Sequence, residues 1–293
     1  MAKVAVVGVG AIGSVLAALL EATGKHQITL CTRRPLAGLA VTTPDGVVDV
    51  TAVNRTEPGL AEPVDWVLVA TKTFDAAGAA AWLPALCAQG ARVAVVQNGV
   101  EHRDRFAAHL SQERILPVII DCQVERRADG RVFQRSEAHL FVETGAAGRE
   151  FAQLFAGSKA DVQLTEDFVT AAWRKLSFNS AGVVCALTSS PSGVLHDEEL
   201  GALAVGIAAE CIAVAQAEGA KLEEGTAQRV LEGYRAQAPD SVNSLLADRL
   251  AGRAMEIDAR NGVIVRRGDR HGIPTPLNRM AVALLKNMKR EEP

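Results

Sequence analysis

Three glycines at a fixed spacing near the start of the chain constrain its fold more than any other feature. They follow the β-branched run Val4–Val7 and precede Ser14–Thr23, where apolar residues recur at helical spacing. In a strand–loop–helix of this kind, the glycines permit a tight turn, a close backbone approach to a ligand and close helix–strand packing. The free N–H groups at the helix start then favour a pyrophosphate. We therefore predict that a dinucleotide is bound by the whole loop, which comprises Gly8, Val9, Gly10, Ala11, Ile12 and Gly13.

The end of the second predicted strand indicates which dinucleotide binds. Ile28–Cys31 is followed by Thr32, Arg33 and Arg34, without the Asp or Glu that usually holds the ribose 2′-hydroxyl of NAD. A guanidinium offers paired donors to a 2′-phosphate, whereas a carboxylate repels it. NADP(H) is therefore the predicted cofactor, with Arg33 favoured over Arg34. Two solvated surface arginines are the alternative.

Strand-like and helix-like segments alternate through the first half of the chain, and only helical patterns follow. Apolar runs separated by helices predict right-handed crossovers and a mostly parallel sheet. Shorter alternating segments come next, with Asp129-Gly130 as a hairpin turn. We predict an α/β fold in which an N-terminal Rossmann-type doubly wound sheet is followed by an all-helical C-terminal domain. Residues 1–166 are the predicted NADP-binding domain, and residues 167–293 the predicted substrate and dimerisation domain.

Charge, hydropathy and cysteine spacing argue against several classes of partner. The formal net charge of −3 gives no electrostatic reason to expect nucleic acid or an anionic membrane. No stretch reaches the roughly 18 uninterrupted apolar residues that a membrane span needs. The five cysteines and six histidines form no ligand set, so we predict no metal, free thiols and a cytoplasmic location. We expect His102 on a surface helix, and Arg126 and Arg127 on a solvated face.

Further polar segments are candidates for chemistry. Lys72 follows a buried strand, and Asn98 follows the next one, at the edge where parallel sheets bind ligands. Lys175 and Asn179 are four residues apart in a predicted helix, Val169–Leu187, and therefore share one face. A partly desolvated lysine acts as a proton donor near neutral pH. The alternative is a solvated lysine beside an asparagine.

Together these motifs resemble the ketopantoate reductase (2-dehydropantoate 2-reductase) family, from Val4 to about Lys286. The motifs occur in the expected order. They are the glycine loop, an arginine after the second strand, Thr71-Lys72-x-Phe74-Asp75, Gln97-Asn98-Gly99-Val100, Trp173-Arg174-Lys175-Leu176-x-x-Asn179, and Met255-Glu256-Ile257-Asp258 followed by Asn261-Gly262.

The resemblance implies reduction of 2-dehydropantoate to pantoate, in pantothenate biosynthesis, by hydride transfer from NADPH. Lys175 would protonate the C2 oxygen as the hydride arrives, and Glu256 would orient the substrate hydroxyl or carbonyl. Asn98 would contact cofactor and substrate, and Lys72 would line the cofactor site. The resemblance also makes Asn179 and Ser244 substrate-binding residues. Ser244 is the candidate donor to the substrate carboxylate.

The chain departs from the family pattern mildly at Leu245, in the stretch Ser244–Asp248, and at a second position that leaves the substrate open. Many members repeat the amide one turn after Asn179, where this chain has Val183. We therefore weigh the hypothesis that Val183 packs on the tail of a bulkier or less polar 2-oxo acid. The sequence is also compatible with a β-hydroxyacid dehydrogenase and with a non-catalytic NADPH-binding regulator. The apolar helix predicted at Glu198–Ala217 packs within the chain or against a second copy, which leaves a homodimer open.

Overall fold

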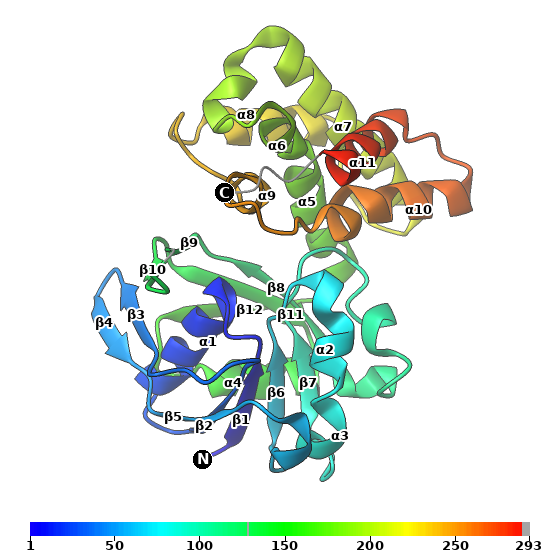
Figure 1. The fold of residues 1–293 in the computed structure, drawn as a ribbon. Coiled ribbons are helices and arrows are strands. Elements are labelled where there is room, and N and C mark those ends of the chain that lie inside the picture. The colour runs from blue at the N-terminus through cyan, green and yellow to red at the C-terminus, as the bar shows by residue number, and fades with distance from the viewer. Residues whose placement is uncertain (128, 289–293) are drawn as a thin grey trace. The chain divides into compact units, whose positions relative to one another are not determined.

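The chain folds into two compact units (Figure 1). The computed structural model describes residues 1–127 and 129–288. Met1–Gln97 and His102–Phe168 form the first unit, whereas Asn98–Glu101 and the chain from Val169 onward form the second. The NADP-binding role of the first domain and the substrate and dimerisation role of the second remain predictions.

An eight-stranded sheet forms the centre of the first unit, in the order β12-β11-β8-β7-β6-β1-β2-β5. The strands from β8 to β5 in this order are parallel, and β11 is antiparallel to β8 and parallel to β12. This arrangement confirms the predicted α/β class with its large parallel sheet. The strands are β1 (Lys3–Val7), β2 (Gln27–Cys31), β5 (Ala52–Arg55), β6 (Trp66–Val69), β7 (Arg92–Val95), β8 (Ile115–Asp121), β11 (Ala138–Glu143) and β12 (Ala160–Thr165).

Helices bury both faces of this sheet. On β1, Val4 and Val6 face a core shared with α1 (Ala11–Ala22) and α4 (Ala146–Leu154). The alternate residues of β1 face a second core with α2 (Ala76–Ala80) and α3 (Leu83–Leu86). Because both faces are covered, the central strands read as continuous apolar runs in the sequence.

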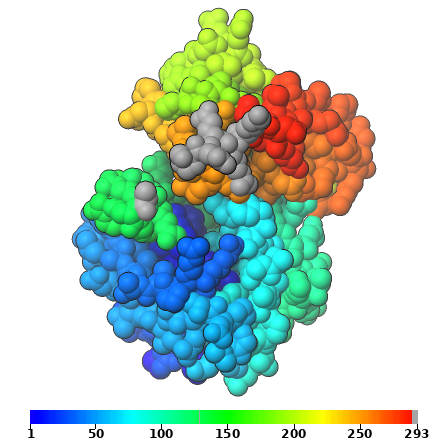
Figure 2. All heavy atoms as spheres, in the orientation of Figure 1, coloured from blue at the N-terminus to red at the C-terminus, as the bar shows by residue number. Residues whose placement is uncertain are grey.

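A second, four-stranded sheet packs on α1 in the order β4-β3-β10-β9. The strands are β3 (Ala40–Thr43), β4 (Gly46–Asp49), β9 (Val124–Arg126) and β10 (Val132–Gln134). The antiparallel pair β9–β10 confirms the predicted hairpin, with Gly130 at φ +88° donating to the carbonyl of Arg127. This hairpin stands at the surface, where β10 pairs with β3 (Figure 2).

The second unit is helical, as predicted (Figure 1). Its helices are α5 (Phe168–Ala181), α6 (Val183–Thr188), α7 (Glu198–Ala217), α8 (Thr226–Arg235), α9 (Ser244–Leu250), α10 (Val263–His271) and α11 (Pro276–Asn287). A single π-helical turn, Asp258–Gly262, precedes α10. Short 3₁₀ turns elsewhere in the described residues are Pro58–Leu60, Thr73–Asp75, Asp104–Phe106, Gln112–Arg114 and Ser192–His196.

The one long helix expected over Val169–Leu187 is wrong, because the structure divides it at Gly182 into α5 and α6. Gly182 is confined on both sides: a Cβ there would lie 2.2 Å from Oη of Tyr234 and 2.9 Å from Nδ2 of Asn243. The close approach of these two side chains therefore requires a glycine at this position, which apolar periodicity alone does not reveal.

Helix α7 is long and apolar enough, by length and composition, to cross a membrane, with a mean hydropathy of 1.8. Here it packs against α8, α10 and α11, and several of its small residues, including Ala204, Ala208 and Ala215, are fully buried. The composition of α7 therefore agrees with its place as the core helix of the second unit.

Candidate active site

The three glycines of the loop after β1 meet different surroundings. Gly8 has φ +94°, and a Cβ there would lie 2.6 Å from Cγ2 of Thr71. A Cβ on Gly13 would lie 2.0 Å from the carbonyl oxygen of Gly8. No atom lies within 4 Å of the position that a Cβ of Gly10 would take. Gly8 and Gly13 are therefore held by packing, whereas the backbone at Gly10 is open to a ligand.

The first turn of α1 is suited to an anion. Gly10 is the N-cap and no side chain caps the helix, so the first N–H groups are not satisfied by a capping side chain. The turn carries no acidic residue. Val9 is buried, and Ala11 and Ile12 are half-buried beside it. Free N–H groups and the helix dipole together favour a phosphate at this point.

The loops after β2 and β6 flank the glycine loop, because β1 lies between these strands in the sheet. Arg33, after β2, is exposed and forms an ion pair with Asp75, which belongs to the loop after β6. Lys72, half-buried, is in that same loop. The structure thus brings Arg33 and the Lys72 loop to one edge of the sheet. The ion pair of Arg33 with Asp75, a motif residue with no predicted role, connects the two loops.

The loop after β7 is held by a buried network. Gln97 donates through Nε2 to the carbonyl oxygen and to Oγ1 of Thr71, at 3.0 Å each, and Nε2 of His102 lies 2.9 Å from the carbonyl oxygen of Gln97. The expectation of a surface His102 is wrong, since its side chain is 2% exposed. Burial lowers the pKa of His102 to about 3, so the ring is neutral at pH 7.

Arg126 also belongs to this edge. It is exposed, as expected, and it makes a long-range contact that the sequence does not signal. From β9 it donates through Nη1 to the carbonyl oxygen of Val9, at 3.0 Å. Its neighbours on the hairpin are engaged differently. Arg127 and Arg135 pair with Glu125 and lie 4.2 and 4.9 Å from the ring centre of Phe133. No local motif signals the contact of Arg126, because 117 positions separate it from Val9.

In the second unit, two predicted site residues are in direct contact. Asn98 donates through Nδ2 to Oε2 of Glu256 at 3.0 Å, across 158 positions of the sequence. Glu256 is only 5% exposed, so this buried carboxylate needs such partners. Asn98 is the first residue of the segment Asn98–Glu101, and contacts of the two last residues of this segment hold it in the second unit. Glu101 pairs with Arg266 at 2.8 Å, and Val100 packs in the helical core.

The other predicted residues of this unit lie on two helices. Lys175 and Asn179 are one turn apart on α5 and half-buried. Ser244 is the first residue of α9 and exposed. Its neighbour Asn243 caps the helix by accepting from the N–H groups of Leu245 and Leu246, at 3.1 and 3.0 Å. The hydroxyl of Ser244 is therefore not consumed by capping.

The hypothesis that Val183 faces a substrate is wrong. Val183 is 0% exposed and packs in the apolar core of the helical unit, with Val184, Ala208 and Leu246 among its members. These neighbours belong to several helices of the second unit, so Val183 is part of its core. The polarity of this position therefore carries no information about the substrate.

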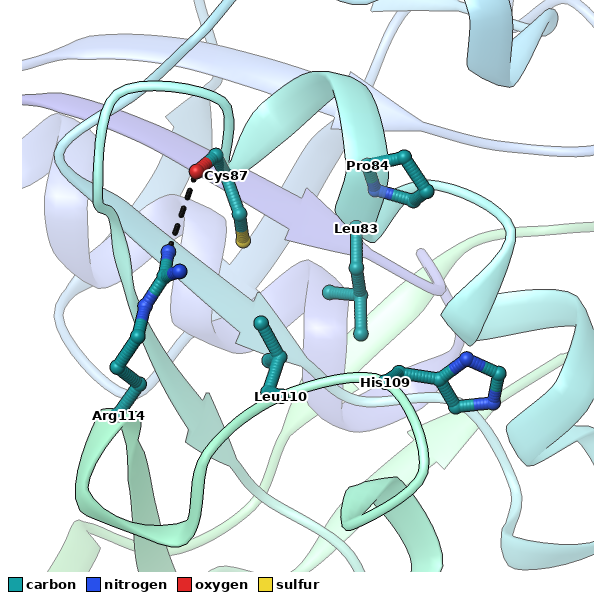
Figure 3. A pocket seen from close by; sticks show the side chains of 6 residues that line it. All are labelled: Leu83, Pro84, Cys87, His109, Leu110 and Arg114. Atoms are coloured by element: carbon teal, nitrogen blue, oxygen red, sulfur yellow. Dashed lines mark hydrogen bonds between the residues drawn. The ribbon is translucent and has the colours of Figure 1, made fainter.

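A pocket of about 260 Å³ lies in the first unit (Figure 3). It is lined by Leu83, Pro84, Cys87, His109, Leu110 and Arg114. Helix α3 leads into β7, and Arg114 precedes β8, so the cavity lies at the opposite edge of the sheet from the glycine loop. The guanidinium of Arg114 donates hydrogen bonds to the carbonyl oxygens of Cys87 and Ala91. Within residues 1–127 and 129–288, no cluster of three His, Cys, Asp or Glu side chains is arranged to hold a metal.

Comparison with known proteins agrees with this arrangement over both units. Residues 4–147 match the family described as ketopantoate reductase PanE/ApbA, and residues 167–289 match its C-terminal family. The chain belongs to the ketopantoate reductase family. It is therefore an oxidoreductase of the kind that uses a nicotinamide cofactor.

Relatives of this ketopantoate reductase family member match it over nearly the full length. The 2-dehydropantoate 2-reductase of Caulobacter vibrioides is 49% identical over 285 residues, covering 97% of this chain and 98% of that protein. The enzyme of the same name from Mycobacterium tuberculosis is 39% identical, with 96% of each chain covered. A ketopantoate reductase structure from Ralstonia eutropha has a TM-score of 0.88 at 33% identity, with 97% of each chain covered. A 2-dehydropantoate 2-reductase structure from Geobacter metallireducens has a TM-score of 0.90 at 27% identity, covering 97% of this chain and 99% of the other.

Substitution of Gly10 and of Gly13 should separate ligand approach from folding. Gly13→Ala should lower the free energy of unfolding by about 3 kcal/mol, because the methyl group overlaps the carbonyl oxygen of Gly8. Gly10→Ala should melt near the wild-type temperature but bind the nicotinamide cofactor more weakly, because the methyl group enters the open approach. Thermal unfolding and a fluorescence titration measure the two effects. Wild-type cofactor affinity in Gly10→Ala would contradict the role of an open backbone at this position.

Proposed function

We propose that the protein reduces 2-dehydropantoate to pantoate with NADPH, the step that supplies pantoate for pantothenate biosynthesis. The observation that carries the proposal is the 49% identity, over 97% of the chain, to a curated 2-dehydropantoate 2-reductase. The contact between Asn98 and Glu256 supports it, because it joins two residues that the family motifs implicate independently. Burial of Val183 removes the reason to prefer another 2-oxo acid.

The reaction needs a hydride at C2 of the 2-oxo acid and a proton on the C2 oxygen. NADPH supplies the hydride when bound. In this proposal, the Lys175 ammonium donates its proton to the C2 oxygen and stabilises the negative charge that develops there. Glu256, held by Asn98, accepts a hydrogen bond from the substrate hydroxyl and fixes its orientation. Asn179 and Ser244 donate to the remaining substrate oxygens.

The residues at the edge of the first unit fit NADP(H). The open backbone at Gly10 and the uncapped first turn of α1 suit the pyrophosphate, and no carboxylate follows β2 directly to repel a 2′-phosphate. Arg33 is mostly exposed, so its guanidinium can exchange the carboxylate of Asp75 for a phosphate. Lys72 completes the proposed cofactor set from the loop after β6.

The chain has five free cysteines, which supports a reducing, cytoplasmic location. The partner that we propose is a small 2-oxo acid, with neither nucleic acid nor membrane. A structure of the same fold, at 22% identity and a TM-score of 0.85, is described as a dimeric ketopantoate reductase from Staphylococcus aureus. A homodimer is accordingly the assembly to test first, by light scattering.

Arg33 should determine the preference for NADPH over NADH. Arg33→Ala should raise the Kd for NADPH about 10- to 100-fold, because a charge-assisted pair with the 2′-phosphate is lost. NADH has no such phosphate, so its Kd should not change. Arg34→Ala is the matched control, since Arg34 is its exposed neighbour. Titration of each variant with both cofactors checks this, and an equal loss for NADH would exclude the assignment to the 2′-phosphate.

Arg126 should affect both cofactors alike, because its guanidinium lies on the glycine loop and the pyrophosphate is common to NADPH and NADH. Arg126→Ala should raise both dissociation constants about tenfold. Arg135→Ala is the control on the same hairpin, where the side chain is occupied by Glu125 and Phe133. If the two variants weaken binding equally, the general charge of the hairpin is responsible and not the contact with Val9.

Lys175→Ala should lower kcat for ketopantoate by about 10²- to 10⁴-fold and leave NADPH affinity unchanged, because only the proton donor is removed. Arg174→Ala, at the exposed neighbouring position, should retain activity. The assay follows NADPH oxidation with ketopantoate, other branched 2-oxo acids and pyruvate. A wild-type protein that binds NADPH but reduces none of them would be a regulator, and one that prefers another acid would require a new substrate assignment.

A further inference from the structure

The carboxyl end of α5 is held by side chains from other elements. The last carbonyl groups of a helix have few intrahelical donors. At the end of α5, that of Phe178 still accepts from the N–H of Gly182, at 3.4 Å. Four carbonyl groups at or just after this end each accept a hydrogen bond from a side chain elsewhere in the second unit. The four hydrogen bonds run from Tyr234 to the carbonyl oxygen of Phe178 (3.1 Å), from Arg260 to that of Asn179, from Asn261 to that of Ser180 (3.1 Å) and from Asn243 to that of Gly182 (3.0 Å).

Among these donors Arg260 is unusual, because it is charged and 2% exposed. Its Nε atom is buried without a hydrogen-bond partner. Burial lowers the pKa of Arg260, and the acidic groups of Tyr234 and Glu256 are among those that oppose the shift. A buried charge that is not fully satisfied costs stability, and an apolar side chain of similar volume is often at least as stable in such a place. Stability of the core is thus a poor explanation for an arginine here.

The position of Arg260 in the sequence suggests a different explanation. It lies one helical turn after Glu256, and its N–H donates to the carbonyl oxygen of Glu256 at 3.2 Å. The two residues are joined through the π-helical turn Asp258–Gly262, a geometry that recurs at functional sites. The guanidinium contacts Asn179, whose helix also carries Lys175 one turn earlier. One side chain therefore connects the Glu256 segment to the helix of the proposed proton donor.

We infer that Arg260 is a positioning residue, which ties the Glu256 segment to the carboxyl end of α5 and thereby fixes Lys175 and Asn179 relative to Glu256. The inference rests on the proposed function. The fork of the guanidinium sets the distance between the two segments, and its charge lies near the Glu256 carboxylate and the negative end of the α5 dipole. Arg260 does not itself touch the reacting atoms.

The kinetic test compares Arg260→Met and Arg260→Lys with Tyr234→Phe, which removes a hydrogen bond to the same helix end one residue earlier. Arg260→Met should lower kcat with ketopantoate about tenfold or more, because small misplacements of reacting groups are costly. Arg260→Lys should recover part of that loss. The Kd for NADPH should stay within about twofold of wild type in all three, since the cofactor loop belongs to the first unit. Tyr234→Phe should lower the melting temperature and keep kcat.

A kcat for Arg260→Met within about twofold of wild type would overturn the inference. If Arg260→Met does not fold, Arg260→Lys decides in the same way, because lysine keeps the charge and loses the planar fork. Failure of the proposed function is distinct, since the wild-type protein itself would then not reduce ketopantoate.

Amide hydrogen exchange gives a readout that needs no substrate. Arg260→Met should raise exchange both in the last turn of α5 and in the segment around Glu256, because it cuts the connection between them. Tyr234→Phe should raise exchange in α5 alone. If both variants raise amide exchange in α5 alone, Arg260 is only a donor to the helix end. That result would overturn the positioning role whether or not the wild-type protein is active.

Discussion

The contact of α1 with β1 is the constraint on which the nucleotide edge depends. The helix approaches so closely that Gly13 has room for no more than a hydrogen atom against the carbonyl of Gly8. This fixes the start of α1 at the carboxyl end of β1, between the loops that follow β2 and β6. The second sheet packs on the same helix, and its strand β9 carries Arg126, which contacts the loop at the carbonyl oxygen of Val9. Two sheets are thus aligned on a single helix, whose own position is set by one pair of glycines.

Local patterns are sufficient to predict the fold class and most of the elements. The glycine loop and the buried strands leave signatures within a few residues, and the predicted helix Glu198–Ala217 has the observed bounds of α7 because its ends carry ordinary capping residues. The strands β3 to β5 escape prediction, since they are short and half-exposed and alternate poorly. The Asn98–Glu256 contact joins residues that motif comparison selects, whereas periodicity alone does not pair them.

Long-range packing accounts for what sequence analysis misses. Spacing suggests that Val183 shares the face of Lys175, whereas in the fold its side chain is buried among apolar residues of several helices. Arg126 reads as a solvated residue because its partner is a backbone carbonyl far away in the chain. Arg260 gives no signal in the sequence, where an arginine near the end of an amphipathic segment is ordinary. Only its burial makes it exceptional.

The four residues Asn98–Glu101 belong to the helical unit although they lie in the middle of the N-terminal sequence. A chimera of two relatives made with a single crossover near residue 168 would take its helices from one parent. It would take Asn98–Glu101 from the other. Glu101 would then face a foreign residue in place of Arg266, and Val100 a foreign core. The boundary along the gene and the boundary in the fold therefore differ, and a viable chimera must inherit this short insertion together with the helices that it serves.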